Sequence, residues 1–507
     1  MTGAMPVVAG LSGRAAIGAA FGLGVVAGTG QAPLGMWWLT LPAFAALVVL
    51  VGRAAGPRRA AVLGLWAGAG HFGLALSWIV EPFLIDMATH GWMAPFALML
   101  MAFGLALFWA VAAGLAACLP GLRARALGFA GALTLAEMAR GVVFTGFPWA
   151  QPGHSLIGTT LAQVAAVAGP EALTLLVMLA AALPVAMRWP GLALSGAMLA
   201  GLWVWGADRL AEPMAANPDA PVIRLVQPNA EQSIKWDPDL VRGHFDRLLT
   251  LTRLPPAPGA PAPELAIWPE TAVPYLMDRT PDALWDIAEA GGGMPVATGI
   301  QRSDGGWRYW NSLAVIGPGG AVQAVYDKHH LVPFGEYIPF GDLIADWFGI
   351  TAFATQEGNG YSFGPGPALL DLGSRLGRAL PLICYEAVFP RDIRAAPGRA
   401  DWLMQVTNDA WFGRLNGPYQ HLAQARLRAI EQGLPMLRVA NTGVSAVIDA
   451  RGRVAGLIPL GVAGHLDVVL PGALPATPYA RHGDLLLWMM LAGLGFAAGL
   501  VAIRGWD

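Results

Sequence analysis

The sequence predicts a multi-span α-helical membrane bundle joined to one large α/β domain outside the cytoplasm. Three observations predict this architecture. The 507-residue chain is 55% hydrophobic and only 13% charged, whereas soluble domains carry about 25% charged residues. The apolar character is concentrated in residues 12–206 and 485–503, while the stretch 210–480 has the composition of an ordinary globular domain. Arginines gather on one side of the apolar segments, as the positive-inside rule requires.

Eight apolar segments are candidates to cross a bilayer, which takes about 20 residues. They are roughly 14–30, 34–51, 60–81, 92–118, 126–146, 160–187, 190–206 and 485–503. We expect the first to be a retained helix rather than a cleaved signal peptide, because further apolar segments follow directly. The predicted domains are therefore a membrane domain (1–206) with about seven helices, a middle domain (207–484), and a last helix with a short cytoplasmic tail (485–507).

The arginines also predict the orientation of these helices. With the N-terminus in the cytoplasm, the loops and tail on that side contain Arg14, Arg53, Arg58, Arg59, Arg123, Arg125, Arg188 and Arg504. The opposite loops, 31–33 and 82–91, contain no lysine or arginine. We therefore expect residues 207–484 outside the cytoplasm, in the periplasm if the cell has two membranes.

Two charged residues interrupt the fifth apolar segment near its outer end. Glu137 and Arg140 lie three residues apart, which places them on one helix face where they can pair. Charge within a membrane is costly and is often functional. A structural pair at the membrane interface is the alternative, and the sequence leaves both interpretations open.

The middle domain changes to short β-branched runs that alternate with turns and helical patterns. Runs typical of strands are Val222–Gln227, Leu265–Trp268, Pro295–Ile300, Ser312–Ile316, Ala321–Tyr326, Ala379–Cys384, Trp402–Val406, Met436–Val439 and Val444–Ile448. Helical patterns cover 237–253, 281–290 and 417–433. Alternating strands and helices over this length predict a layered α/β domain.

Three of these strands end beside a chemically reactive residue. Glu270 follows the run 265–268, Lys328 follows 321–326, and Cys384 ends 379–384. Ligands and catalytic groups collect at the C-terminal edge of α/β sheets, and the spacing between the three is roughly one strand–helix–strand unit each, so they can converge on one site. A carboxylate base, an ammonium group and a thiol suit acyl transfer through a thioester. We expect the ammonium to lower the pKa of the thiol and to stabilise an oxyanion.

Composition narrows the functional classes further. The net charge is −2, and no basic stripe of the kind that binds nucleic acid is present. The only two cysteines, Cys118 and Cys384, lie in different domains, so we expect no disulfide. Neither a phosphate-binding glycine loop nor a metal-spaced His/Cys cluster occurs, and we expect no metal and no organic cofactor. The chain contains only two lysines, Lys235 and Lys328; for Lys235, chance and a chemical role remain open.

At these residues the chain resembles the nitrilase (carbon–nitrogen hydrolase) superfamily. The resemblance rests on WPE at 268–270, YDKHHLVPFGEYIP at 326–339 and LICYE at 382–386. With apolar helices on both sides, it resembles the membrane branch of that superfamily, the apolipoprotein N-acyltransferases. TGFPWAQPGHS at 145–155, QPNAEQSIKWDP at 227–238 and TNDAWFG at 407–413 also fit that family. The resemblance implies an αββα sandwich for the middle domain.

The resemblance also implies roles for individual residues. Glu270 would be the general base, Lys328 the oxyanion-stabilising cation and Cys384 the acylated nucleophile. Glu336 would be a second carboxylate that orients Lys328 and the reacting amine. Further required residues would be Tyr385 and Glu386, with Trp236 on a mobile arm near the site. Asn311 is a plausible site residue that no motif supports.

The implied reaction moves the sn-1 acyl chain of a phospholipid, typically phosphatidylethanolamine, to the cysteine. The amino group of the diacylglyceryl-cysteine of an apolipoprotein then takes the chain from the thioester. The implied location is the inner membrane of a bacterium, with the catalytic domain on the periplasmic side. We expect a monomer, because no heptad seam or repeat suggests assembly.

A long loop, 342–364, carries Ile344, Trp347, Phe348, Ile350 and Phe353. Loops of this length are often lids, and its apolar residues would either dip into the bilayer or cover a small core. Two rivals remain for the function. A membrane-tethered amidase or nitrilase would use the same three residues with water as the acceptor. A transporter or scaffold would need more intramembrane charge than the chain contains.

Overall fold

The computed structural model describes residues 13–213, 219–339 and 360–504. Its contacts divide the chain into two compact units. The first consists of Met1–Pro213, Leu415–Gln432 and Ala476–Asp507, and the second of Met214–Arg414 and Gly433–Pro475. The first unit thus contains two segments, from 415 and from 476, that the boundaries expected from the sequence include in the middle domain. The predicted apolar residues 344–353 of the long loop lie outside the described ranges.

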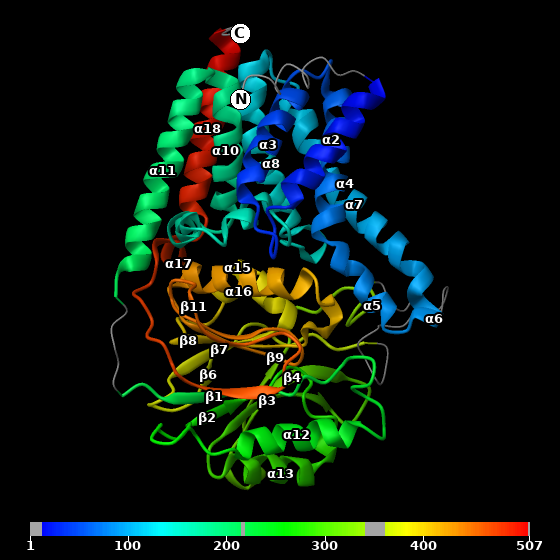
Figure 1. Cartoon of the computed structure of the whole chain (residues 1–507), viewed down its shortest axis with the longest axis vertical. Helices are drawn as coiled ribbons and strands as arrows, with labels where there is room; N and C mark the ends of the chain where they lie inside the picture. The colour runs from blue at the N-terminus through cyan, green and yellow to red at the C-terminus, as the bar shows by residue number, and fades with distance from the viewer. Residues whose placement is uncertain (1–12, 214–218, 340–359, 505–507) are drawn as a thin grey trace. The chain divides into compact units, whose positions relative to one another are not determined.

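The first unit is a bundle of mostly apolar helices, drawn in Figure 1 from blue to green with a red last helix, together with the orange helix α16. Its longer helices are α2 (Gly13–Gly28), α3 (Trp37–Gly52), α4 (Pro57–Ala75), α7 (Ala94–Ala116), α8 (Leu122–Arg140), α10 (Glu171–Met187), α11 (Trp189–Ala211), α16 (Gly417–Gln432) and α18 (Leu485–Arg504). Short helical turns connect them: η1 (Ser77–Val80), α5 (Glu81–Leu84), α6 (Met87–His90), η2 (Gly91–Met93), η3 (Val143–Thr145), η4 (Pro152–Leu156), η5 (Thr160–Val164), α9 (Ala165–Ala168) and α17 (Pro478–His482).

Each of the eight predicted spans contains an apolar helix, but the helices differ in how well they suit a bilayer. Among the described residues, three are long and apolar enough to cross one: Met87–Ala116, Trp189–Ala211 and Leu485–Arg504. Two further candidates are pairs bent at a break, by 65° after α4 and by 120° before α10. The helices α2 and α3 have 16 residues each, and α8 contains two arginines in its first turns and an ion pair at its end.

Small residues let these helices approach closely. A Cβ atom at Gly24 of α2 would lie 1.9 Å from the carbonyl oxygen of Ala67 in α4, and one at Gly64 would lie 2.5 Å from that of Trp109 in α7. Membrane helices have no hydrophobic drive to associate, so close van der Waals packing at small residues holds them together. These two positions therefore require glycine.

The intramembrane pair Glu137–Arg140 is buried and serves the packing of α8. The two side chains form a salt bridge, and Trp109 of α7 donates its indole N–H to Glu137 at 2.7 Å. Arg140 also donates to the carbonyl of Phe147. A buried charge is tolerable when it is paired and hydrogen-bonded, and here the pair fixes the loop after α8.

That loop, which contains the TGFPWAQPGHS motif, connects to the amphipathic helix α16. The indole N–H of Trp149 donates to the side-chain oxygen of Gln420 at 2.7 Å, and the Gln420 amide donates to the carbonyl of Ala75 at 2.9 Å. His71 of α4 bonds the carbonyl of Ala150 at 2.8 Å. The predicted helix 417–433 therefore groups with the first unit, and most of its residues are buried.

The second unit is an α/β sandwich of two six-stranded sheets. The first sheet has the order β12-β1-β2-β3-β4-β5, and its strands are β1 (Val222–Gln227), β2 (Leu265–Ile267), β3 (Val296–Ser303), β4 (Tyr309–Ile316), β5 (Val322–Asp327) and β12 (Gly464–Val469). The second has the order β11-β10-β9-β8-β7-β6, and its strands are β6 (Leu370–Asp371), β7 (Arg378–Ile383), β8 (Trp402–Thr407), β9 (Met436–Ala440), β10 (Ser445–Ile448) and β11 (Val454–Ile458).

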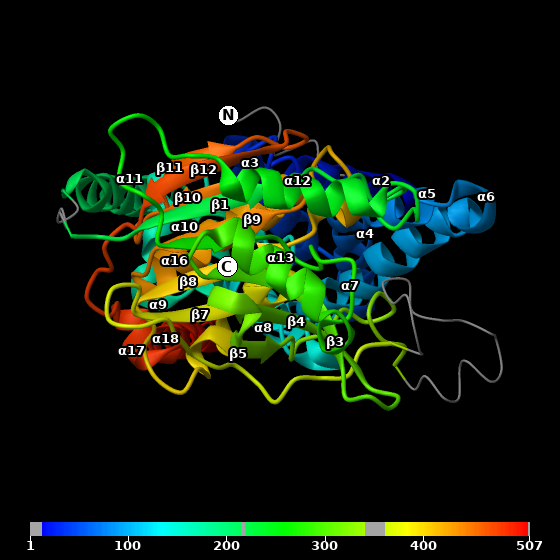
Figure 2. The same cartoon turned by 90° about the horizontal axis from the view of Figure 1, so that it is seen from below.

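Apolar side chains from both sheets form one buried core, in which Leu225 and Leu313 of the first sheet join Trp402 and Val439 of the second. The other face of the first sheet packs on α12 (Val241–Arg253) and α13 (Pro281–Gly291), as Figure 2 shows in green. Burial on both faces explains why these strands read as continuous apolar runs. The predicted fold class, a membrane bundle with a nitrilase-like α/β domain, is confirmed.

All nine predicted strands are present, but three strands escaped prediction: β6, β11 and β12. β6 has only two residues. β11 and β12 are edge or near-edge strands with exposed positions, and Asp467 within β12 interrupts the apolar pattern. The antiparallel pair β3–β4 also extends further than its apolar residues, to Ser303 opposite Tyr309, because backbone pairing does not depend on side-chain polarity.

Candidate active site

Glu270 lies just past the end of β2, in a turn held tightly against β3. The backbone N–H of Gly299 donates to the carbonyl of Pro269 at 3.1 Å, and Ala272 N–H donates back to Gly299 at 2.8 Å. A Cβ atom at position 299 would lie 2.5 Å from that Pro269 oxygen. Only glycine at 299 therefore permits the turn that presents the Glu270 carboxylate.

Lys328 follows β5, which runs in the same direction as β2 because β3–β4 and β4–β5 are both antiparallel pairs. Its backbone N–H donates to the carbonyl of Asn311 at 2.9 Å. Its side chain is only 1% exposed, and Nζ lies 2.9 Å from Glu336 and 3.4 Å from Glu270. The predicted convergence of Glu270 and Lys328 at one sheet edge is thus a direct contact.

Cys384 follows β7 and begins the short helix η8 (Cys384–Val388). Its φ angle is +51°, a left-handed conformation that is unfavourable for a residue with a side chain. Strain of this kind persists where the surrounding structure enforces it and clusters at functional sites. The thiol is buried at 5% exposure, and the charges of both Glu270 and Lys328 act on it. The sharp turn therefore directs the thiol toward Glu270 and Lys328, which lie at the end of the first sheet.

Three further groups complete the hydrogen bonding of the two carboxylates. The Asn311 amide donates to Glu270 at 2.8 Å and to Glu336 at 3.0 Å. The backbone N–H of Asn408 donates to the second oxygen of Glu270 at 2.9 Å, and that of Val332 donates to Glu336 at 2.9 Å. Such bonds to charged acceptors fix both carboxylates in place.

The charge states of the thiol and the ammonium follow from this arrangement. Burial raises the pKa of the Cys384 thiol, the charge of Glu270 raises it further, and Lys328 lowers it by less. The ammonium of Lys328 thus lowers the thiol pKa as expected, but burial and Glu270 outweigh it, and the pKa lies well above the ordinary value. Burial by itself lowers the pKa of Lys328, but the charges of Glu336 and Glu270 outweigh it and raise that pKa. At neutral pH a neutral thiol thus faces a charged ammonium.

Tyr385 and Glu386 stabilise the turn around the thiol rather than extend the charged cluster. The Glu386 carboxylate accepts the N–H of Ile383 at 2.7 Å and that of His329 at 2.8 Å, and the Tyr326 hydroxyl donates to it at 2.9 Å. It therefore joins the start of η8 to the segment that carries Lys328. The Tyr385 ring packs edge-on against His330 and Phe389 (in the loop to α15, Pro390–Arg394).

A second charged cluster lies on this supporting side. His329 Nδ1 is 2.7 Å from Glu386, and His330 Nδ1 is 2.7 Å from Asp392. Burial lowers the pKa of His329, but its hydrogen bonds to Asp392 and Glu386 outweigh that effect and raise the pKa to about 9. Asp392 correspondingly has a pKa of about 2, because its bonds to the two histidines outweigh its burial.

Trp236 is half-buried on the loop between β1 and α12. Its ring lies 5.0 Å from Nζ of Lys235, and Lys235 donates to Thr271, next to Glu270, at 2.9 Å. The loop thus reaches the turn that presents Glu270, while the role that the resemblance implies for Trp236 stays a prediction. Asn311, Lys235 and Asn408 contact Glu270. The sequence offered Asn311 as a plausible site residue without a motif and left a role for Lys235 open, whereas Asn408 was not singled out. The available signals were the rarity of lysine and the TNDAWFG motif.

No group of three or more His, Cys, Asp or Glu side chains within residues 13–213, 219–339 and 360–504 is arranged to hold a metal ion. Lys328, the Asn311 amide and the backbone N–H of Asn408 all donate to the Glu270 carboxylate, whereas the buried Oδ1 of Asn311 has no hydrogen-bond partner among the described residues. The contact of the Lys328 ammonium with the carboxylates of Glu270 and Glu336 supports chemistry by proton transfer and by a charged hydrogen-bond donor.

Comparison with known proteins gives the family. Residues 23–183 match the apolipoprotein N-acyltransferase N-terminal domain, and residues 243–467 match the carbon–nitrogen hydrolase family. The chain is 36% identical to an apolipoprotein N-acyltransferase of Sinorhizobium medicae, over 98% of this chain and 97% of that one. It is 38% identical to that of Brucella melitensis (91% and 90%) and 39% identical to that of Caulobacter vibrioides (87% and 86%).

Among solved structures, a nitrilase-superfamily amidase from Nesterenkonia is similar, with 18% identity, a TM-score of 0.38, and coverage of 55% of this chain and 98% of that one. The relatives above match the membrane unit as well as the catalytic unit, and they do so over nearly the full chain. The chain belongs to the apolipoprotein N-acyltransferase family, the membrane branch of the carbon–nitrogen hydrolase superfamily.

Proposed function

We propose that this enzyme transfers the sn-1 acyl chain of a phospholipid, through a thioester on Cys384, to the N-terminal amino group of a diacylglyceryl-cysteine. The observation that carries the proposal is the buried contact of Lys328 with Glu270 and Glu336, beside a neutral thiol in a strained turn. The names of the relatives supply the acceptor class, an apolipoprotein.

In the first step, Sγ of Cys384 attacks the ester carbonyl carbon while Glu270 takes the thiol proton. Because the thiol is neutral at physiological pH, attack needs this base. The carbonyl oxygen becomes an oxyanion, and the ammonium of Lys328 stabilises it. The C–O ester bond then breaks, and Glu270 returns the proton to the leaving oxygen of the lysophospholipid. The enzyme is left with a thioester.

In the second step, the acceptor amine attacks the thioester carbon. Glu270 removes the amine proton, Lys328 again stabilises the oxyanion, and the C–S bond breaks. The Cys384 sulfur regains a proton from Glu270, and the product is an amide. Glu336 keeps Lys328 charged and oriented through both steps. Tyr385 and Glu386 support the turn of the nucleophile, and Trp236 borders the site on its mobile arm.

The proposed location is the inner membrane of a bacterium, with residues 207–484 on the periplasmic side and the domain boundaries expected from the sequence. The distribution of arginines supports this orientation, and lipid-anchored substrates give a reason for the membrane bundle. We propose phosphatidylethanolamine-like lipids as donors and a monomeric enzyme. No cofactor enters the mechanism.

The acceptor distinguishes this function from a membrane-tethered amidase or nitrilase, which would give the acyl chain to water. The test uses detergent-purified enzyme acylated from phosphatidylethanolamine with a labelled sn-1 chain, then offered a diacylated lipopeptide with a free amino terminus. We expect the label to move into an amide on the lipopeptide, and not onto the same peptide with an acetylated terminus. Release of the label as free fatty acid, at a rate that the lipopeptide does not change, would favour the hydrolase instead.

A further inference from the structure

The second lysine of the chain, Lys235, is built into the surroundings of the general base. It lies on the loop between β1 and α12 and is 5% exposed. Its ammonium donates to the Thr271 hydroxyl at 2.9 Å and faces the backbone carbonyl of Glu270 at 3.4 Å. The mechanism above gives this buried cation no function. Burying an ammonium carries a substantial desolvation penalty, so the site retains Lys235 at a cost in stability.

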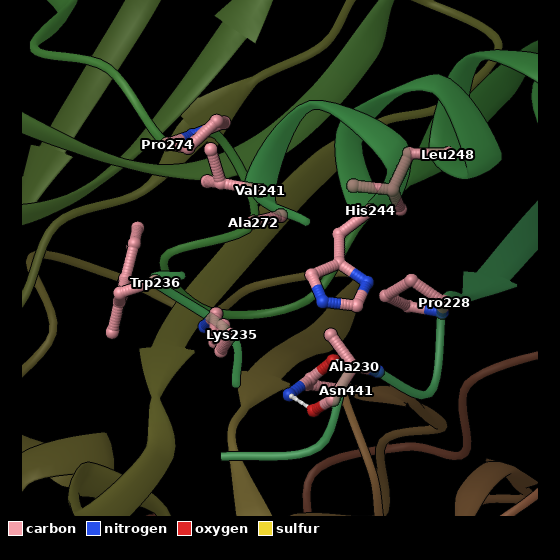
Figure 3. A pocket seen from close by; sticks show the side chains of 10 residues that line it. All are labelled: Pro228, Ala230, Lys235, Trp236, Val241, His244, Leu248, Ala272, Pro274 and Asn441. Atoms are coloured by element: carbon pink, nitrogen blue, oxygen red, sulfur yellow. Dashed lines mark hydrogen bonds between the residues drawn. The ribbon is translucent and has the colours of Figure 1, made fainter. Parts of the chain in front are cut away.

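The same loop is fastened to Glu270 from its other end as well. The Asn441 side chain donates to the carbonyl of Ala230 at 2.8 Å and accepts the N–H of Ala230 at 3.0 Å. Figure 3 shows Asn441 against Ala230, with Lys235 and Trp236 further along the loop. The Asn441 amide also donates to the side chain of Asn408 at 3.0 Å, and Asn408 donates to Gln232 at 2.7 Å.

These bonds close a ring around the base. Asn408 contacts the Glu270 carboxylate through its backbone N–H and the loop through its side chain. Lys235 contacts the Glu270 backbone and Thr271 from the far end of the loop. Trp236, whose ring lies 5.0 Å from the Lys235 ammonium, directly follows that anchor on the loop. Because of these bonds, movement of the loop that carries Lys235 and Trp236 would also displace Glu270.

We propose that Lys235 is a positioning residue that holds the Trp236 loop and the turn of the general base together, so that the loop is seated whenever Glu270 is placed for proton transfer. The hydrogen bonds of Lys235 alone support its role in holding the loop. Its effect on proton transfer by Glu270 rests on the proposed function. Lys235 does this by bonding two acceptors on the Glu270–Thr271 turn, while the asparagine pair fixes the opposite end of the loop.

The charge of Lys235 makes this link sensitive to pH. Burial lowers the pKa of Lys235 to about 8, and the charge of Glu270 offsets part of that effect. Two titratable groups face the ammonium: Glu270 on the β2 turn and His244 on α12. The charged, strongly donating form therefore predominates below about pH 8 and is lost as the pH rises above it. Lys328 and Cys384 have raised pKa values, so they do not titrate in this range.

Hydrogen exchange tests, without any substrate, whether Lys235 holds the Trp236 loop in place. In the Lys235→Met variant of the full chain, we expect amide protons of residues 229–237 to exchange about tenfold faster at pH 7, because a hydrogen-bonding charge is lost. The matched control is Arg247→Met, which removes a cation that bonds Pro228 in the same region without touching Glu270, and exchange at 232–237 should stay as in the wild type. Equal protection in the wild type and in Lys235→Met would overturn the proposal, whatever the enzyme acts on.

The rate of thioester formation from labelled phospholipid tests the catalytic link. We expect Lys235→Met to slow it about tenfold at pH 7 with a small change in KM. In the wild type the rate should fall above pH 8, and in Lys235→Arg, which cannot lose its charge, that fall should be absent. His329→Asn controls for the other group that titrates nearby, at about 9. The same fall near pH 8 in the wild type, Lys235→Arg and Lys235→Met would overturn the role of Lys235, whereas no thioester in the wild type would instead overturn the proposed function.

Discussion

The two lysines of this chain are both buried beside Glu270, yet their surroundings give them opposite properties. Lys328 faces the carboxylates of Glu270 and Glu336 directly, and its pKa is raised. Lys235 donates its hydrogen bonds to a hydroxyl and a backbone carbonyl rather than to a carboxylate, and burial lowers its pKa to about 8, with the charge of Glu270 offsetting part of that effect. Burial is nearly the same for both, so the number of facing carboxylates decides the charge state. Lys328 is therefore suited to stabilise an oxyanion at any physiological pH. Lys235 is suited to hold a loop only at a pH at which its ammonium is charged.

Removing Lys328 should have the largest effect. Lys328→Met deletes the group that we place at the oxyanion, and loss of one such donor slows catalysis about 100- to 1,000-fold. The measurement is the rate of hydroxylamine-labile labelling of the protein by an sn-1-labelled phospholipid. Two unpaired buried carboxylates also destabilise the fold, so the double variant Glu270→Gln, Lys328→Met serves as the folded comparison. Near-normal labelling in folded Lys328→Met would remove Lys328 from the mechanism.

Glu336→Gln should make Lys328 behave more like Lys235. The amide keeps the shape of the side chain but removes one of the two charges that raise the pKa of Lys328. We expect the rate of thioester formation to fall about tenfold to 100-fold, and to acquire a decline at alkaline pH that the Lys328 ammonium does not cause in the wild type. The sign follows because a lower lysine pKa means loss of the ammonium at lower pH. A pH profile with the wild-type shape would contradict this account of Glu336.

Thr271→Val should lower the pKa of Lys235 further and so increase its difference from the pKa of Lys328. The hydroxyl accepts a hydrogen bond from the charged lysine at 2.9 Å, so its loss disfavours the ammonium and lowers the pKa further. A hydrogen bond to a charged group contributes on the order of 1.5 kcal/mol, and we expect thioester formation at pH 8 to slow about fivefold. Thr271→Ser, which retains the hydroxyl, is the matched control. An unchanged alkaline decline in Thr271→Val would mean that the hydroxyl does not hold Lys235.

The smallest effect concerns stability on the supporting side of the site. The pKa of His329 rises from 6.5 to about 9 on folding, so its stabilising contribution is complete below pH 6.5 and is lost as the pH rises through 9. We expect the melting temperature of the catalytic unit to fall by a few degrees between those values, and by less in His329→Asn. Differential scanning calorimetry at several pH values measures this change. If the melting temperatures of the wild type and His329→Asn depend on pH in the same way, His329 does not cause the change.

Sequence alone could predict the positions of Glu270, Lys328 and Cys384 because each follows a strand, and parallel strands bring their C-terminal ends to one edge. It could not predict the contacts of Asn311. That residue lies within β4, an antiparallel strand whose pairing extends beyond its apolar run. Lys235 was distinguished only by its rarity, because the reach of a loop to a turn 35 residues away is set by tertiary structure.

Two expectations from the sequence needed the structure to correct or refine them. The ammonium of Lys328 lowers the pKa of the Cys384 thiol as expected, but burial and the charge of Glu270 outweigh it and raise that pKa. Burial is not visible in a motif. The helix after β8 shows the same limit. Its amphipathic pattern predicted α16 correctly, but the contacts of the helix group its residues with the first unit, whereas the boundaries expected from the sequence include them in the middle domain. A periodic sequence pattern predicts that a helix forms. The elements that this helix contacts are set by the tertiary structure.

The measurement that tests the central claim most directly is the intact mass of the protein after incubation with a phospholipid of one defined sn-1 chain. The account predicts a gain of one acyl group per chain, located on the peptide that contains Cys384, with release of an equal amount of lysophospholipid and loss of the acyl group in hydroxylamine. The Cys384→Ser variant should form no hydroxylamine-labile adduct, while Cys118→Ser should behave as the wild type. An acyl group at another residue, or turnover that persists in Cys384→Ser, would contradict the account.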